Sequence, residues 1–175
     1  MTRIAFIIVL MFSSIPLLGQ TNFAKQLDEL VKDSTNSFRS FKSNFKETRF
    51  TEVLPDSIFY TNLSLDGTSN NELLFSTGES IFMADVADSL NEAHGKRMVD
   101  EWRDKINFLL GSGFTIEDVK GIEGNPSKYG WNFTKGNLTI NIGLYPHKKN
   151  SNLNWIGLAV SVFEDEETEL ANKND

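Results

Sequence analysis

The chain has two histidines and no cysteine, so few of its side chains could act as a catalytic base, a nucleophilic thiol or a soft metal ligand. His94 falls on the apolar stripe of a predicted helix, where a histidine usually belongs to the core or its boundary. His147 lies in a Pro-His-Lys-Lys loop with no carboxylate near it in sequence. The absence of cysteine excludes disulfides, thiol catalysis and thiolate zinc sites. The sequence therefore predicts no metal site and no cofactor.

The serines and carboxylates also lack the spacing of a known catalytic motif. No serine stands in a Gly-x-Ser-x-Gly elbow, and pairs such as Asp100/Asp104 are typical of a solvated helix face. Residues 66–72 are rich in side-chain oxygens, but they lack the alternating ligand spacing of a calcium loop and are better explained as a turn. We therefore predict no catalytic residue and favour a non-enzymatic protein. The alternative enzyme is a small hydrolase whose site is assembled from distant residues and leaves no local motif.

Binding chemistry is easier to place, because polar and aromatic side chains alternate with apolar ones in the last third of the chain. Strands are predicted at 129–134, 138–145 and 155–163. The candidate binding residues share one face of these strands: Asn132, Thr139, Asn141, Tyr145 and Trp155, with Thr134, Ser161 and Phe163 beside them. If helices cover the other face, this one presents amides, hydroxyls and two aromatic anchors. Alternatively, the first helix or the acidic tail covers this face, or Trp155 packs beneath the loop after Pro146.

The same alternation predicts how these strands pair. A hairpin around Lys135-Gly136 would place Phe133 opposite Leu138, Trp131 opposite Ile140 and Tyr129 opposite Ile142, with the large apolar groups on one face. Earlier in the chain, strands are predicted at 57–65, 73–75 and 80–86, the last two joined around Thr77-Gly78. Residues 114–122 fit either a strand or a loop.

Residues 88–111 predict the helix around which the strands are arranged. Its apolar stripe consists of Leu90, His94, Met98, Trp102, Ile106 and Leu110. We expect Asp85 or Asp88 to cap its start and Gly111 to end it. Trp102 lies in the middle of the stripe and is expected to be largely buried, whereas Asp100 is expected on the solvated face.

A second amphipathic helix is predicted from Thr21, with a possible break within 34–37. Its stripe consists of Phe23, Leu27, Val31, Ser34, Phe38, Phe41 and Phe45. The favoured interpretation is that these rings pack on the sheet. The alternative is contact with an anionic membrane surface through Phe38, Arg39, Phe41 and Lys42, which the acidic residues of the same segment disfavour.

The two ends of the chain have distinct compositions. Residues 1–20 have the layout of a secretory signal peptide, with cleavage expected after Gly19 or Gln20, and their apolar run is too short for a transmembrane anchor. We expect residues 21–164 to form one domain and residues 165–175 an acidic flexible tail. The expected location is therefore periplasmic or extracellular.

These patterns predict an α+β fold: an antiparallel sheet with two amphipathic helices packed on one face, in the order helix, strands, helix, strands. The two halves share this layout without matching residues. A net charge of −7 argues against nucleic acid as a partner. The predicted function is an exported, non-enzymatic binding domain for a protein or glycan. The alternatives are an inhibitor or immunity-type protein that binds a basic partner, and the small hydrolase.

Overall fold

The computed structural model of the chain describes residues 16–50, 55–119, 126–147, 149–150 and 152–163. The body of the predicted signal peptide and the predicted tail, 165–175, lie outside these residues. The elements are α2 (Pro16–Asp33), the 3-10 turns η1 (Ser34–Asn36) and η2 (Arg39–Phe41), β1 (Lys42–Phe50), β2 (Pro55–Thr61), β3 (Ser69–Ser76), β4 (Glu79–Leu90), α3 (Glu92–Leu110), β5 (Thr115–Asp118), β6 (Tyr129–Lys135), β7 (Leu138–Pro146) and β8 (Asn154–Phe163).

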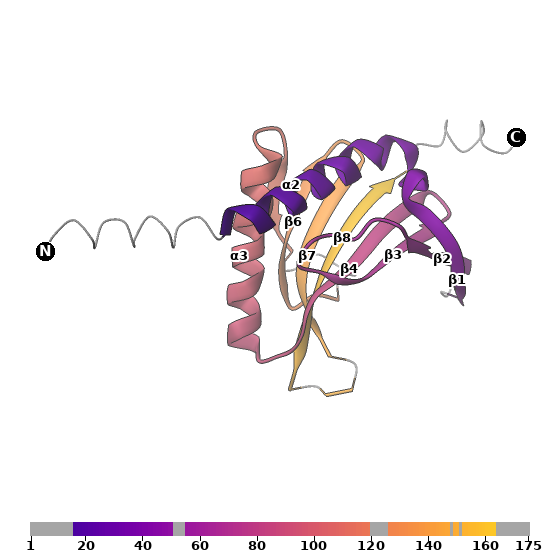
Figure 1. The fold of residues 1–175 in the computed structure, drawn as a ribbon. Helices are drawn as coiled ribbons and strands as arrows, with labels where there is room; N and C mark the ends of the chain where they lie inside the picture. Colours follow the sequence, from indigo (N-terminus) through magenta and orange to yellow (C-terminus); the bar gives the residue numbers. More distant parts are fainter. Residues whose placement is uncertain (1–15, 51–54, 120–125, 148, 151, 164–175) are drawn as a thin grey trace, which may run out of the picture.

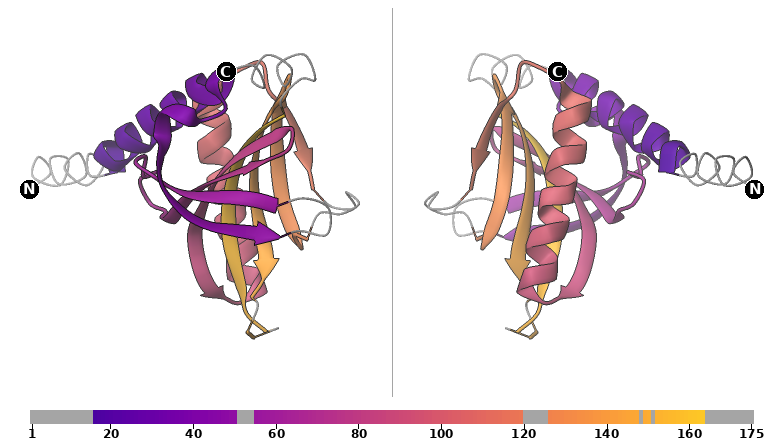
Figure 2. Two further views of the ribbon diagram at one scale, coloured as in Figure 1. Left: turned by 90° about the vertical axis from the view of Figure 1, so that its right-hand side faces the viewer. Right: turned by 90° about the vertical axis from the view of Figure 1, so that its left-hand side faces the viewer.

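The strands form one eight-stranded antiparallel sheet in the order β1-β2-β3-β4-β8-β7-β6-β5 (Figure 1). Each half is a helix followed by four strands, and the order of the second half reverses that of the first. The halves meet where β4 pairs with β8. The fold is therefore α+β with an antiparallel sheet, as the sequence predicts. The two helices do not cover the sheet equally: α3 lies along it, whereas α2 crosses near one end (Figure 2).

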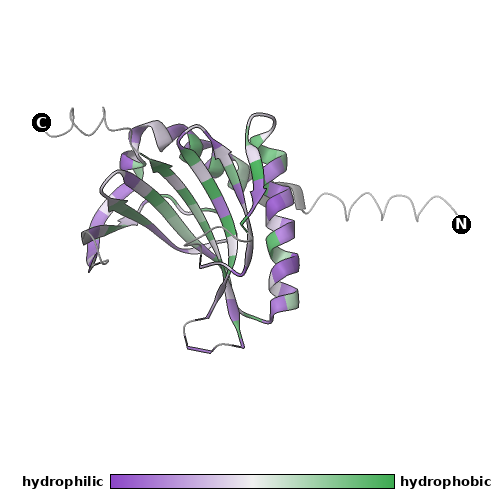
Figure 3. Cartoon of the chain, turned by 180° about the vertical axis from the view of Figure 1, so that it is seen from behind, coloured by the Kyte–Doolittle hydropathy of each residue, from purple (hydrophilic) through white to green (hydrophobic). Residues whose placement is uncertain are grey.

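The core lies between this sheet and the helices. One continuous row of register partners crosses all eight strands, and it reads Phe45, Phe59, Leu73, Phe82, Val160, Ile140, Phe133 and Ile116. The central members are fully buried, while Phe45 and Ile116 at the edges are 55% and 39% exposed. Along the strands, hydrophobic and hydrophilic residues alternate, and α3 carries hydrophilic residues interrupted by hydrophobic ones (Figure 3). Burial of this row stabilises the sheet from one side.

The central helix begins later than predicted, because β4 continues to Leu90. Its N-cap is Asn91, whose side chain accepts a hydrogen bond from the backbone N–H of His94 at 2.9 Å. The predicted caps Asp85 and Asp88 lie instead on β4. The helix ends at Gly111 as predicted, with a φ of +64° that favours glycine.

The buried stripe of α3 is rotated from the predicted one. Its buried members are Gly95, Val99 and Ile106. A Cβ on Gly95 would lie 2.4 Å from Leu144 Cδ1, so the glycine sets the closest approach of helix and sheet. The prediction for His94 is wrong, because this rotation leaves its side chain exposed.

Trp102 is only half-buried. Its ring packs edge-on against Phe23 of α2, with the ring centroids 5.1 Å apart, and it covers Gly67. It therefore joins the two helices at the margin of the core.

Asp100 was expected to be solvated, and this prediction is wrong. Its carboxylate accepts hydrogen bonds from the Tyr129 hydroxyl at 2.7 Å, from the Trp131 indole N–H at 3.1 Å and from Arg103 at 3.1 Å. The two rings stand on β6, and both belong to the margin of the core. Asp100 therefore fastens α3 to the sheet with two charge-assisted hydrogen bonds, while its contact with Arg103 stays within the helix.

The first helix is shorter than its phenylalanine spacing suggests, since α2 ends at Asp33. Ser37 and Phe38 adopt left-handed φ values of 51° and 59°, and the helix ends just before residues 34–37, where the sequence indicates a break. Phe45 consequently lies on β1. Phe38 is fully buried and Phe41 half-buried, so these rings form no exposed aromatic stripe for a membrane surface. Within the described residues, neither helix combines the length and the apolar character needed to cross a membrane.

The strand predictions hold best in the second half of the chain. The β3–β4 hairpin turns at Thr77–Gly78 as predicted, β2 ends earlier than predicted, and residues 115–118 form the short edge strand β5. The β6–β7 register differs from the predicted one by two residues: Phe133 faces Ile140, Trp131 faces Ile142 and Tyr129 faces Leu144. The reason is that the turn residues are Gly136 and Asn137, one position later than the predicted Lys135-Gly136 turn, with Gly136 at φ +60°. A shift of two keeps every side chain on its predicted face.

Candidate functional site

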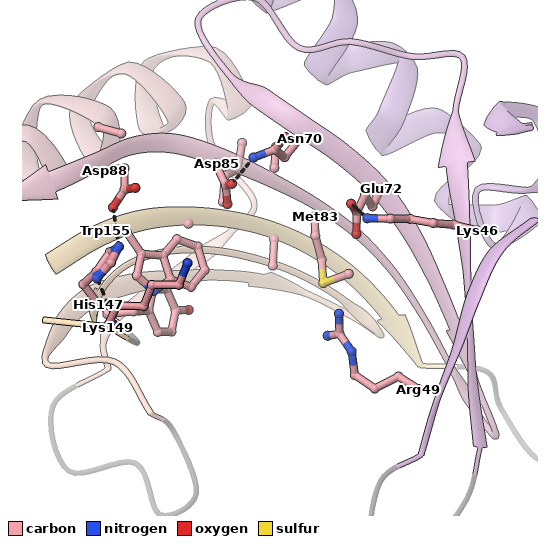
Figure 4. Close-up of a pocket in the computed structure, with 16 residues that line it drawn as sticks. Lys46, Arg49, Asn70, Glu72, Met83, Asp85, Asp88, His147, Lys149 and Trp155 are labelled. Atoms are coloured by element: carbon pink, nitrogen blue, oxygen red, sulfur yellow. Dashed lines mark hydrogen bonds and ion pairs between the residues drawn. The ribbon is translucent and has the colours of Figure 1, made fainter.

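The strands of the sheet arch, and neither of the described helices α2 and α3 lies on their concave side (Figure 4). A hollow of about 740 Å³ lies there, lined by residues of β1, β3, β4, β7 and β8 and of the segment after β7. We call it the concave groove. Further along β2 and β3, Ile58 and Leu74 are buried on the same side of the sheet, so the hollow is confined to the region around β4 and β8.

Two aromatic rings line part of the groove, and two glycines pack against them. Tyr145 and Trp155 are register partners on β7 and β8, and their rings stack with centroids 4.7 Å apart and planes inclined by 24°. The next register pair on the same face of these strands is Gly143 and Gly157. A Cβ on Gly143 would lie 2.9 Å from the Tyr145 ring, and one on Gly157 would lie 2.6 Å from the Trp155 ring. The glycines therefore let both rings lie down along the strands.

A chain of hydrogen bonds runs from this aromatic pair across the sheet. The Tyr145 hydroxyl donates to Asn141 Oδ1 at 2.8 Å, and Asn141 Nδ2 donates to Asn132 Oδ1 at 2.7 Å. Burial raises the pKa of Tyr145 to about 12, which extends the pH range over which its hydroxyl stays protonated. The hydrogen bonds and the stacking together fix the orientation of the Tyr145 ring.

The sequence-predicted binding residues separate into three groups. Tyr145 and Trp155 line the concave groove. Asn141 and Asn132 do not line it but are joined to it through the Tyr145 hydroxyl. Thr139 lies one row further along β7, opposite Ser161 and Thr134, and outside the groove.

The sequence patterns did not predict that charged residues line the groove. Lys46 of β1 forms an ion pair with Glu72 of β3, and this hydrogen bond raises the pKa of Lys46. Asp85 of β4 accepts a hydrogen bond from Asn70 at 2.7 Å.

A second charged group lies on the other side of the groove. His147 Nε2 lies 3.6 Å from the Asp88 carboxylate, although no carboxylate is near this histidine in sequence. Arg49 projects into the hollow from β1, and Lys149 lies beside Trp155 on the opposite side (Figure 4).

β-Bulges place several of these charged side chains. The β1–β2 register shifts between Phe45 and Glu47, so Arg49 pairs with Asp56 on the groove side of the sheet. The β3–β4 register shifts after Ser69, where Asn70 has a φ of 49°. Asparagine tolerates this conformation well, which was the one local signal that pointed to an irregular strand here.

The groove can stack and hydrogen-bond a ligand, and its carboxylates and cations can pair with a polar one. Within the described residues, no cluster of three or more histidines and carboxylates could hold a metal ion. Comparison with protein-family models, with curated proteins and with solved structures finds no match for this chain.

Proposed function

We propose that the chain is an exported, non-enzymatic binding domain and that the concave groove receives its ligand. The observation that supports this most directly is the stacked Tyr145–Trp155 pair, held in place within a hollow on the helix-free side of the sheet. Tryptophan and tyrosine are among the residues that most often anchor a bound partner, and ligand sites are usually concave.

The site is arranged before any ligand arrives. Stacking, the Gly143–Gly157 pair and the bond to Asn141 each restrict the rings. A ligand that packs on Trp155 therefore does not have to order it, which removes part of the entropic cost of binding.

In this proposal the two helices cover one face of the sheet, and the ligand binds on the opposite face. Several side chains of α2 and α3 belong to one core with the strands. We take residues 1–20 as the leader that exports the domain. The groove's imidazole, His147, is oriented toward Asp88, and among the described groove residues no serine or threonine accompanies it as a nucleophile.

A single-tryptophan reporter tests the proposal. Trp102→Phe combined with Trp131→Phe leaves Trp155 as the only tryptophan. Iodide should quench its fluorescence, and adding the ligand from the exported fraction should reduce that quenching. Trp155→Ala in the otherwise native chain should abolish retention of that ligand. Phe108→Ala is the matched control, since Phe108 is 86% exposed on α3 and outside the groove. Loss of retention in the control alone, or no protection of Trp155, would overturn the proposal.

A further inference from the structure

We infer that the ligand of the concave groove is an acidic oligosaccharide, with a sugar ring packed on Trp155 and its uronate carboxylates bound by Arg49 and Lys149. This inference rests on the proposed function and names the substrate class of the same groove. It follows from the distribution of charge, from the aromatic surface and from the position of the groove within the sheet.

The charges of the groove leave two cations to meet a ligand. Of the three carboxylates in the lining, Glu72 is paired with the Lys46 cation, Asp88 lies 3.6 Å from His147, and Asp85 accepts a hydrogen bond from the neutral Asn70 amide. Arg49 and Lys149 come from opposite walls (Figure 4).

Both cations are accessible to an incoming carboxylate. Arg49 lies 3.6 Å from Glu47, and both side chains are about half exposed, so this is a weak surface pair that a ligand can replace. Among the described residues, Lys149 has no carboxylate within ion-pair distance. A planar guanidinium binds a carboxylate through two parallel hydrogen bonds, whereas a lysine binds it as a point charge. Two separated cations suit a ligand that carries carboxylates at intervals.

The aromatic surface suits a sugar ring. An aromatic face carries partial negative charge, and a pyranose presents C–H bonds with partial positive charge on one face. Trp155 is half-buried, with Tyr145 stacked against it, so it offers a fixed ring to a ligand. Asp85 and Asp88 are acceptors for sugar hydroxyls, which donate hydrogen bonds without bringing charge.

A peptide fits this groove less well. Sheets usually bind extended peptides by adding a strand at an edge, where main-chain groups are available. The floor here is formed by β4 and β8, which are paired on both sides at the centre of the sheet.

Calorimetric titration of the full exported chain tests the inference. The probes are hexasaccharides of galacturonate and of mannuronate, neutral maltohexaose and cellohexaose, and hexaglutamate as the acidic peptide. At least one uronate should bind, and the neutral sugars should bind at least tenfold more weakly. Arg49→Gln and Lys149→Gln should each weaken uronate binding about tenfold, the loss of one charge-assisted contact. Higher salt should weaken it too.

Lys32→Gln is the matched control, because Lys32 is an exposed lysine on α2 that pairs with Asp28, outside the groove. It should bind the uronate like the native chain, and circular dichroism should show that all three variants are folded. Equal binding of neutral sugars, or tighter binding of hexaglutamate, would overturn the acidic-sugar assignment. Binding of none of these probes would overturn it too. In each of these cases the Trp155 reporter decides separately whether the groove binds a ligand at all.

Discussion

Replacing Asp100 should destabilise the protein far more than its place on the outer part of a helix suggests. Asp100→Ala removes the acceptor for the Tyr129 hydroxyl, the Trp131 indole and Arg103. A hydrogen bond to a charged group contributes roughly 1.5–3 kcal/mol when buried. The Asp100 side chain is 37% exposed, so water can replace part of this interaction. We therefore expect the free energy of unfolding to fall by about 2–3 kcal/mol in total.

Urea denaturation measures this difference directly. With a slope of about 2 kcal/mol per molar urea, the expected loss lowers the midpoint by roughly 1 M or more. Asp104→Ala is the matched control: it also removes an Arg103 partner, but its side chain is 70% exposed, so the expected change is below about 0.5 kcal/mol. A double-mutant cycle with Tyr129→Phe should show coupling between Asp100 and Tyr129. Equal midpoints for the two aspartate variants would refute the fastening role of Asp100.

Three further outcomes are expected. Burial raises the pKa of Tyr145 to about 12, above its value in the unfolded chain, so the unfolded chain loses this proton first as the pH rises. The free energy of unfolding should therefore fall by roughly 2 kcal/mol between about pH 10 and 12. Denaturation of the Tyr145→Phe variant over the same pH series should lack this loss. Gly157→Ala places a methyl group against the Trp155 ring and should lower the free energy of unfolding by about 1–3 kcal/mol. It should also change the fluorescence spectrum of a variant in which Trp155 is the only tryptophan. An unchanged spectrum would mean that the ring does not lie over the glycine. Mass spectrometry of the exported protein should find the chain starting after Gly19 or Gln20, and a retained Met1 would contradict the leader.

Local periodicity was sufficient to predict the second half of the sheet. In β7 and β8, the large aliphatic residues recur at every second position, and burial follows that alternation except at Gly143 and Gly157, which are also buried. Tyr145 and Trp155 could therefore be placed from sequence alone on the face of the sheet opposite the apolar one. The stacking of their rings could not, because it depends on the pairing of Gly143 with Gly157 across two strands.

Local periodicity misled where a turn separates two elements of different period. Phe38, Phe41 and Phe45 are spaced by three and four residues, as in a helix, but Phe38 is the N-cap of η2, Phe41 ends η2 and Phe45 lies on β1. The change of direction depends on left-handed φ values at Ser37 and Phe38, residues that rarely adopt them. Because the phenylalanine spacing predicts a helix through Phe45, it does not predict the strand β1, from which Lys46 and Arg49 reach the groove.

The position of the groove follows from a difference between the two halves of the sheet. Among the described strands, the β5–β6, β6–β7 and β7–β8 pairs keep an unbroken register. Register shifts occur instead in the β1–β2, β3–β4 and β4–β8 pairs. A bulge bends its strand and increases the local twist, so these irregular pairs curl the first half toward the regular second half. The hollow forms where the two meet, with the regular half supplying the aromatic pair and the irregular half supplying Arg49, Lys46 and Asp85. Straightening one bulge should therefore weaken binding without touching Trp155, since it would move the cations away from the rings.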